Sequence, residues 1–121
     1  MKTKKVVIDR TKWLRGKGPS NSYLWDSQSG RGCCLGHVLN KAHGKSYKSM
    51  NRFRSPATYA VRINKKNPLC ILNPLHKSYE HSEDIRRAMR INDSSFRSDE
   101  HREKELKELM LPLGYELVFI N

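Results

Sequence analysis

The sequence predicts an α+β fold: a small antiparallel sheet packed against two to three helices in a single domain. A β-branched run at Val6–Ile8 and an apolar run at Leu117–Ile120 predict strands near the two ends of the chain. Two segments of the C-terminal third combine helix-start signals with apolar residues three or four apart. The length of 121 residues fits one domain, in which we expect a basic, irregular, proline-containing segment at about residues 45–80.

The N-terminal half alternates short apolar runs with turn residues. After the strand at Val6–Ile8, Asp9 is placed to cap a short helical turn. Tyr23–Trp25 predicts a second strand of the same sheet. Residues 33–43 carry apolar side chains at helical spacing, and Gly44 follows them as a C-cap. This half therefore supplies two strands and one helix to the predicted fold.

The C-terminal third contains two helices and the last strand. We expect helices near 83–91 and 99–111, because Ser82 and Ser98 can each act as an N-cap ahead of first-turn acids. Gly114 ends the second helix, and the strand that follows is expected to pair with the first strand. The second helix is expected to bury Leu106, Leu109, Met110 and Leu113.

The charge of the chain is distributed unevenly. The formal net charge is +12, and residues 1–66 contain 16 lysines and arginines with only two acids. Between Asp26 and Glu80 the chain carries ten lysines and arginines and no acid. Because like charges repel at short range, this stretch favours an anionic partner, above all nucleic acid. The alternative is a solvated basic surface without a partner.

Aromatic side chains are interleaved with these cations. Tyr47 and Phe53 can stack on bases while the neighbouring cations hold phosphates. Alternatively, they anchor an irregular segment to the core, as we expect of Trp13 and Trp25. The predicted residues for binding nucleic acid or another polyanion are Lys41, Lys45, Tyr47, Lys48, Arg52, Phe53, Arg54, Arg62, Lys65 and Lys66.

The cysteines invite a metal interpretation that the spacing does not favour. Cys33 and Cys34 precede His37, but adjacent cysteines on a helix point about 100° apart and chelate poorly. We expect Cys34 in the core and Cys33 at its edge. Cys70 with His76 and His81 is a second metal candidate, in which the two histidines fit the H-x4-H spacing. We expect no cofactor and no metal.

A nuclease interpretation rests on four residues near one another in the sequence. His76, Glu80, His81 and Asp84 are groups that nuclease metal sites use. The acids among them are better explained as first-turn acids at the start of a helix. We therefore expect no catalytic site.

Compartment and membrane signals point the same way. No apolar run exceeds four residues, which argues against a membrane-spanning helix. The basic start is followed by too short an apolar run for a signal peptide. Three cysteines do not form a disulfide framework. We expect a cytoplasmic protein with reduced thiols and no membrane partner.

The order of several motifs resembles a group of small uncharacterised bacteriophage and prophage proteins. The matching blocks are Ile8-Asp9-Arg10-x-Lys12-Trp13-x-Arg15-Gly16, Cys33-Cys34-Leu35-Gly36, Ile91-Asn92-Asp93, Arg102-Glu103-x-x-Leu106-x-x-Leu109 and Gly114-Tyr115-Glu116-Leu117-Val118-Phe119. They span most of the chain but leave out residues 45–80. The resemblance implies a viral origin, hence the cytoplasm of a host cell, and brings no site residues with it.

Together these observations favour a non-enzymatic phage accessory protein that binds nucleic acid or a host nucleoprotein complex through a basic face. The first alternative is a protein–protein inhibitor of a host defence or transcription complex, with the same cations against an acidic protein surface. The second alternative is a metal-dependent nuclease.

Overall fold

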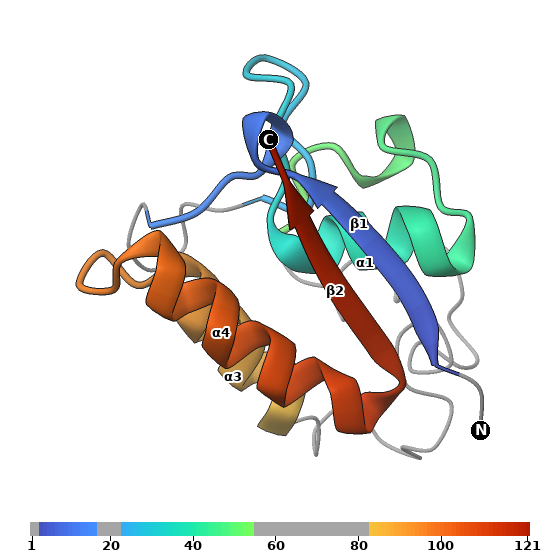
Figure 1. Cartoon of the computed structure of the whole chain (residues 1–121). Coiled ribbons are helices and arrows are strands. Elements are labelled where there is room, and N and C mark those ends of the chain that lie inside the picture. The colour runs from blue at the N-terminus through green and yellow to red at the C-terminus, as the bar shows by residue number, and fades with distance from the viewer. Residues whose placement is uncertain (1–2, 17–22, 55–82) are drawn as a thin grey trace.

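The computed structural model describes residues 3–16, 23–54 and 83–121. The predicted α+β class is confirmed, with a two-stranded sheet and three α-helices in these ranges (Figure 1). The elements are β1 (Lys4–Asp9), α1 (Cys34–His43), α3 (Glu83–Asp93), α4 (Asp99–Met110) and β2 (Tyr115–Ile120). Short 3-10 turns lie at Arg10–Lys12, Lys48–Met50 and Leu111–Leu113.

The sheet is parallel, so the predicted antiparallel arrangement is wrong. β1 pairs with β2 in a register that places Val6 beside Leu117 and Ile8 beside Phe119. The direction of β2 is set by α4, which returns the chain to the end of the sheet where β1 begins. There the Lys4 N–H donates to the Gly114 carbonyl at 2.8 Å, just before β2 starts. The two strands therefore start together, although 105 residues separate Asp9 from Tyr115.

One face of the sheet is buried under the helices. Val6 and Ile8 of β1 are inaccessible to solvent, whereas Val7 between them is exposed. β2 alternates in the same way, with Leu117 and Phe119 buried and Ile120 exposed. This period of two is that of a half-buried strand. In Figure 1, α1 lies behind β1 and packs on it, and the α3–α4 pair lies beside β2, with α4 in contact with that strand.

The predicted strand at Tyr23–Trp25 is also wrong. Residues Trp25 and Asp26 form only isolated bridges, to Asn51 and Arg31 respectively. The backbone of this segment bonds instead to neighbouring loops, since the Leu24 N–H donates to the Phe53 carbonyl at 2.7 Å. This short apolar run is bonded to loops on both sides, so it does not pair with a strand of the sheet.

Close packing of α1 on this segment explains the glycine of the Cys-Cys-Leu-Gly block. A Cβ at Gly36 would lie 1.8 Å from the carbonyl oxygen of Leu24, a separation that backbone atoms cannot accommodate. Gly36 therefore lets the first turns of α1 rest directly on the backbone at Leu24. We expect a larger side chain here to disrupt the core.

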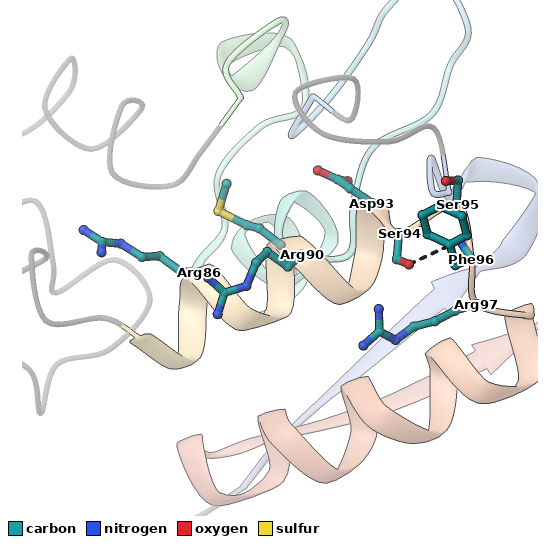
Figure 2. Close-up of a pocket in the computed structure, with 8 residues that line it drawn as sticks. Arg86, Arg90, Asp93, Ser94, Ser95, Phe96 and Arg97 are labelled. Atoms are coloured by element: carbon teal, nitrogen blue, oxygen red, sulfur yellow. Dashed lines mark hydrogen bonds between the residues drawn. The ribbon is translucent and has the colours of Figure 1, made fainter.

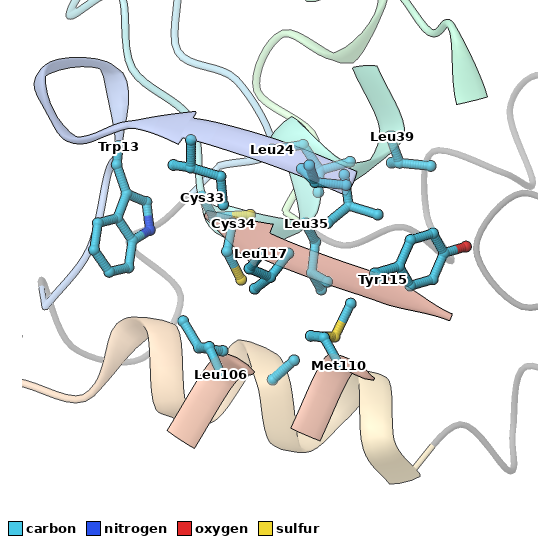
Figure 3. Packing of buried hydrophobic residues seen from close by; sticks show 14 of the residues in the cluster. Trp13, Leu24, Cys33, Cys34, Leu35, Leu39, Leu106, Met110, Tyr115 and Leu117 are labelled. Atoms are coloured by element: carbon cyan, nitrogen blue, oxygen red, sulfur yellow. The ribbon is translucent and has the colours of Figure 1, made fainter. Parts of the chain in front are cut away.

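The core joins the buried sheet face to all three helices (Figure 3). Trp13 is fully buried and packs on Phe119, with ring centroids 4.6 Å apart. Cys33 and Cys34 are both buried free thiols. Cys34 lies in the core as expected, and Cys33, which we expected at the edge of the core, lies inside it as well. Leu106 and Met110 of α4 are likewise inaccessible, while Leu109 and Leu113 are only partly buried against this core.

The helix boundaries follow the predicted signals. The side chains of Asp9 and Ser98 cap the turns that follow them, and Gly44 and Gly114 have φ of 67° and 99°, the left-handed conformation that ends a helix. Ser82 lies outside the described residues. None of the helices in the described ranges is long and apolar enough to cross a membrane.

Candidate nucleic-acid interface

Residues 41–54, here named the basic segment, contain five of the predicted cations. Lys41 lies on the last turn of α1, and the others follow on the loop that includes the turn Lys48–Met50. Four of the five side chains are exposed, and Lys45 is half-buried. None of the five forms an ion pair with a carboxylate of the described residues. The basic segment thus presents uncompensated positive charge. Arg62, Lys65 and Lys66 lie outside the described residues.

The backbone that carries these cations is held in place. The Arg52 N–H donates to the Trp25 carbonyl at 2.8 Å. The Asn51 side chain accepts a hydrogen bond from the Ser27 N–H at 2.9 Å. The guanidinium of Arg54 lies over the ring of Tyr23, 5.6 Å from its centroid. The charges therefore sit on a fixed loop, which reduces the entropy lost on binding.

Arg52 adopts a backbone conformation that its side chain does not favour. Its φ is 64°, in the left-handed region where residues other than glycine and asparagine are uncommon. Such a conformation costs about 1–2 kcal/mol for a residue with a Cβ. An exposed arginine at a position that suits glycine is consistent with a use for its charge.

Tyr47 supports the loop from beneath. Its ring stacks on Trp25 with centroids 4.1 Å apart and planes inclined by 27°. Its hydroxyl donates to Nδ1 of buried His37 at 2.8 Å, because the His37 Nε2–H donates to the Lys12 carbonyl. Burial raises the pKa of Tyr47 to about 12 and lowers that of His37. Phe53 also packs against the core. These contacts match the anchoring alternative, and stacking on bases by either ring stays a prediction.

A second group of charges, here named the arginine junction, is built differently. Arg10 forms two 2.7 Å hydrogen bonds with Glu103. Arg15 grips Asp99 with two bonds and covers the Trp13 ring at 4.5 Å. The arginine junction consists of Arg10, Arg15, Arg97 and Arg102 with Asp99, Glu103 and Glu105. Its carboxylates almost balance its arginines.

Arg102 of the arginine junction and the neighbouring residue Asn92 are both buried and hydrogen-bonded. Arg102 is almost inaccessible and donates to the carbonyls of Ile91, Ser94 and Arg97. Asn92 accepts from the Trp13 indole at 2.7 Å and from the Cys34 N–H at 3.0 Å. Its amide donates to the Leu14 carbonyl at 3.0 Å. Four of the five motif blocks of the resemblance, all but Gly114–Phe119, therefore meet here through hydrogen bonds.

The two described cysteines are buried thiols. Burial raises the pKa of Cys33 to about 12, and that of Cys34 is raised as well, which disfavours the reactive thiolate. No cluster of three or more histidine, cysteine or acidic side chains suited to a metal ion occurs among the described residues. His76, Glu80, His81 and Cys70 lie outside them. Asp84 is a partly buried residue of the first turn of α3.

Sequence reasoning missed one surface feature, on the turn between α3 and α4. Phe96 is 99% exposed and borders a pocket of about 520 Å³ (Figure 2). Arg86, Arg90 and Arg97 line the same pocket. A single aromatic in the serine-rich turn Ser94-Ser95-Phe96-Arg97-Ser98 is the signal that could have identified it.

Comparison with known proteins returns no matching family model, curated protein or solved structure.

Proposed function

We propose that this protein is a non-enzymatic accessory protein that binds nucleic acid, free or within a host nucleoprotein complex, through the basic segment. The observation that carries the proposal is the set of five cations on the last turn of α1 and the loop that follows it, none paired with a described carboxylate. The phage setting of the proposal comes from the motif resemblance alone.

The charge pattern favours phosphates as the partner. Lys41, Lys48, Arg52 and Arg54 are exposed together, and the sequence around them supplies no acid to neutralise them. Binding that neutralises phosphates releases counterions, which offsets the repulsion among these cations. Contacts of this kind position a protein on the backbone without reading its sequence, so we expect weak sequence preference.

Fluorescence anisotropy with labelled 30-mers of several sequences tests the proposal. We expect binding at about 150 mM salt, where charges beyond roughly 8 Å are screened, and a linear fall of log K with log salt. Measurable affinity only at low salt would overturn the proposal and favour the acidic surface of a protein as the partner.

The same oligonucleotides test the absence of turnover. We expect them to stay intact with Mg²⁺, Mn²⁺ or Zn²⁺ added. Cleavage that disappears in His76→Ala or His81→Ala would contradict the non-enzymatic part of the proposal and support the nuclease alternative.

A further inference from the structure

The α3–α4 turn carries an aromatic side chain with almost no contact to the rest of the protein. Phe96 is 99% exposed, more than any other large hydrophobic residue among those described. A phenylalanine on the surface gains nothing from burial in its own chain. Its whole ring is therefore available for contact with a partner.

The turn is fixed, so the exposure of Phe96 belongs to an ordered surface. The guanidinium of Arg102 donates to the carbonyls of Ser94 and Arg97, on either side of the ring. The Phe96 N–H donates to the Ser94 hydroxyl at 3.3 Å, the dashed line in Figure 2. The ring is therefore presented on a rigid support in the unbound protein.

Three arginines line the pocket that Phe96 borders. Arg86 and Arg90 extend from α3 along the pocket, and Arg97 lies beside Phe96 (Figure 2). Arg97 is paired with Glu105, and Asp93 is the one carboxylate among the described residues that line the pocket. Arg86 and Arg90 are four residues apart on one helix face, where like charges repel. Positive charge therefore prevails among the described residues that line the pocket.

We propose that Phe96 and this pocket bind an unpaired base of single-stranded nucleic acid, with Arg86 and Arg90 on the flanking phosphates. The inference rests on the proposed function and specifies its substrate class. An exposed ring beside guanidinium groups has the chemistry of base stacking combined with phosphate contacts. A pocket of about 520 Å³ is within the range that holds small ligands.

The inference assigns the stacking to a different ring from those that the sequence suggested. Tyr47 already stacks on Trp25, and Phe53 packs on the core, so a base would have to displace protein contacts there. Phe96 needs no such displacement.

The test compares Phe96→Ala with Phe96→Trp and the control Leu111→Ala, which removes another exposed apolar side chain. Each variant is titrated with a single-stranded and a double-stranded 30-mer. For Phe96→Ala we expect roughly 5- to 100-fold weaker binding to the single strand, a much smaller change for the duplex, and an unchanged salt slope. Phe96→Trp should retain affinity, and its added fluorescence should be quenched by the single strand.

The outcomes separate the two proposals. If the wild-type protein binds no oligonucleotide at about 150 mM salt, the proposed function fails. If it binds but Phe96→Ala matches Leu111→Ala, only this inference fails. Equal losses on single strand and duplex would also overturn it. If Phe96→Ala loses binding to a poly-glutamate peptide but keeps its binding to nucleic acid, the inference is overturned and the pocket is assigned to an acidic protein. A thermal melt of Phe96→Ala should match wild type, since the ring is exposed.

Discussion

The arginine junction and the basic segment use similar side chains for opposite purposes. In the arginine junction, Arg10 and Arg15 each grip a carboxylate with two hydrogen bonds, and Arg102 satisfies three carbonyls. In the basic segment, Lys48 and Arg52 have no described carboxylate partner. Net charge alone does not distinguish the two regions. The two regions differ in the partners of their cations. These partners imply that the arginine junction stabilises the fold, whereas the basic segment is available for binding.

Arg102→Met should have the largest effect on stability. Methionine keeps much of the volume but leaves the carbonyls of Ile91, Ser94 and Arg97 without their donor, at a cost of about 3–4 kcal/mol in the free energy of unfolding. Urea denaturation measures the loss. Lys104→Ala, an exposed control on the same helix, should change stability by less than about 0.5 kcal/mol. A loss for Arg102→Met as small as the control's would remove the structural role of the arginine junction.

Asn92→Ala should have the next largest effect on stability. It removes the acceptor of the Trp13 indole and of the Cys34 N–H, and the donor to the Leu14 carbonyl. Buried groups left unsatisfied cost about 1–3 kcal/mol each, and we expect a total of about 2–3 kcal/mol after relaxation. Gln28→Ala, which removes an exposed side-chain amide, is the control in the same urea titration. Equal midpoints for the two variants would show that Asn92 does not join the three segments.

Acid should affect the two regions in different pH ranges. Burial, with nearby Lys4 and Lys45, lowers the pKa of His43 to about 4, and burial lowers that of His37. Their protonation favours the unfolded chain, whose histidines titrate near 6.5, so stability should fall as the pH drops from about 6.5 towards 4.

The arginine junction should respond only at lower pH. Hydrogen bonding and charge from Arg15 lower the pKa of Asp99, and Arg97 lowers that of Glu105. Their stabilisation is present above the ordinary carboxyl pKa and lost as the pH falls through the lowered value. His43→Gln should therefore reduce the fall of the urea midpoint between pH 6.5 and 4.5, with the share due to His37 remaining, and leave the change below pH 4 intact. An unchanged profile above pH 4.5 would contradict the role of His43.

Arg52→Gly should have the smallest effect on stability. Glycine relieves the φ of 64° but adds conformational entropy to the unfolded chain, and these terms nearly cancel. We expect a change within about 1 kcal/mol in urea titrations, together with weaker nucleic-acid binding. A large loss of stability would place Arg52 with the structural arginines.

Local signals were enough to predict the helices but not the arrangement of the sheet. Apolar spacing, the cap at Ser98 and the glycines at 44 and 114 act over a few residues, so the sequence shows them directly. The direction of β2 depends on where α4 delivers the chain, and alternation in a strand carries no information about direction. Tyr23–Trp25 is a loop because its partners lie on other loops.

The candidate site was predicted for its charges and not for its rings. Lys41 and Lys48 are exposed, as a charged stretch implies, but Tyr47 is anchored by Trp25, 22 residues earlier in the chain. No local pattern encodes that contact. Phe96 was missed because a turn between two helices has no periodicity from which to read burial.

Salt-dependent binding of two double variants tests the central claim most directly. Lys48→Gln/Arg52→Gln and Lys104→Gln/Lys107→Gln each remove two positive charges from exposed positions, the second pair from a helix rich in acids. With a single-stranded 30-mer, we predict that the first variant makes the negative slope of log K against log salt shallower by about two, with unchanged stability. The second variant should keep the slope of the wild type. Equal slopes for the two variants would contradict it.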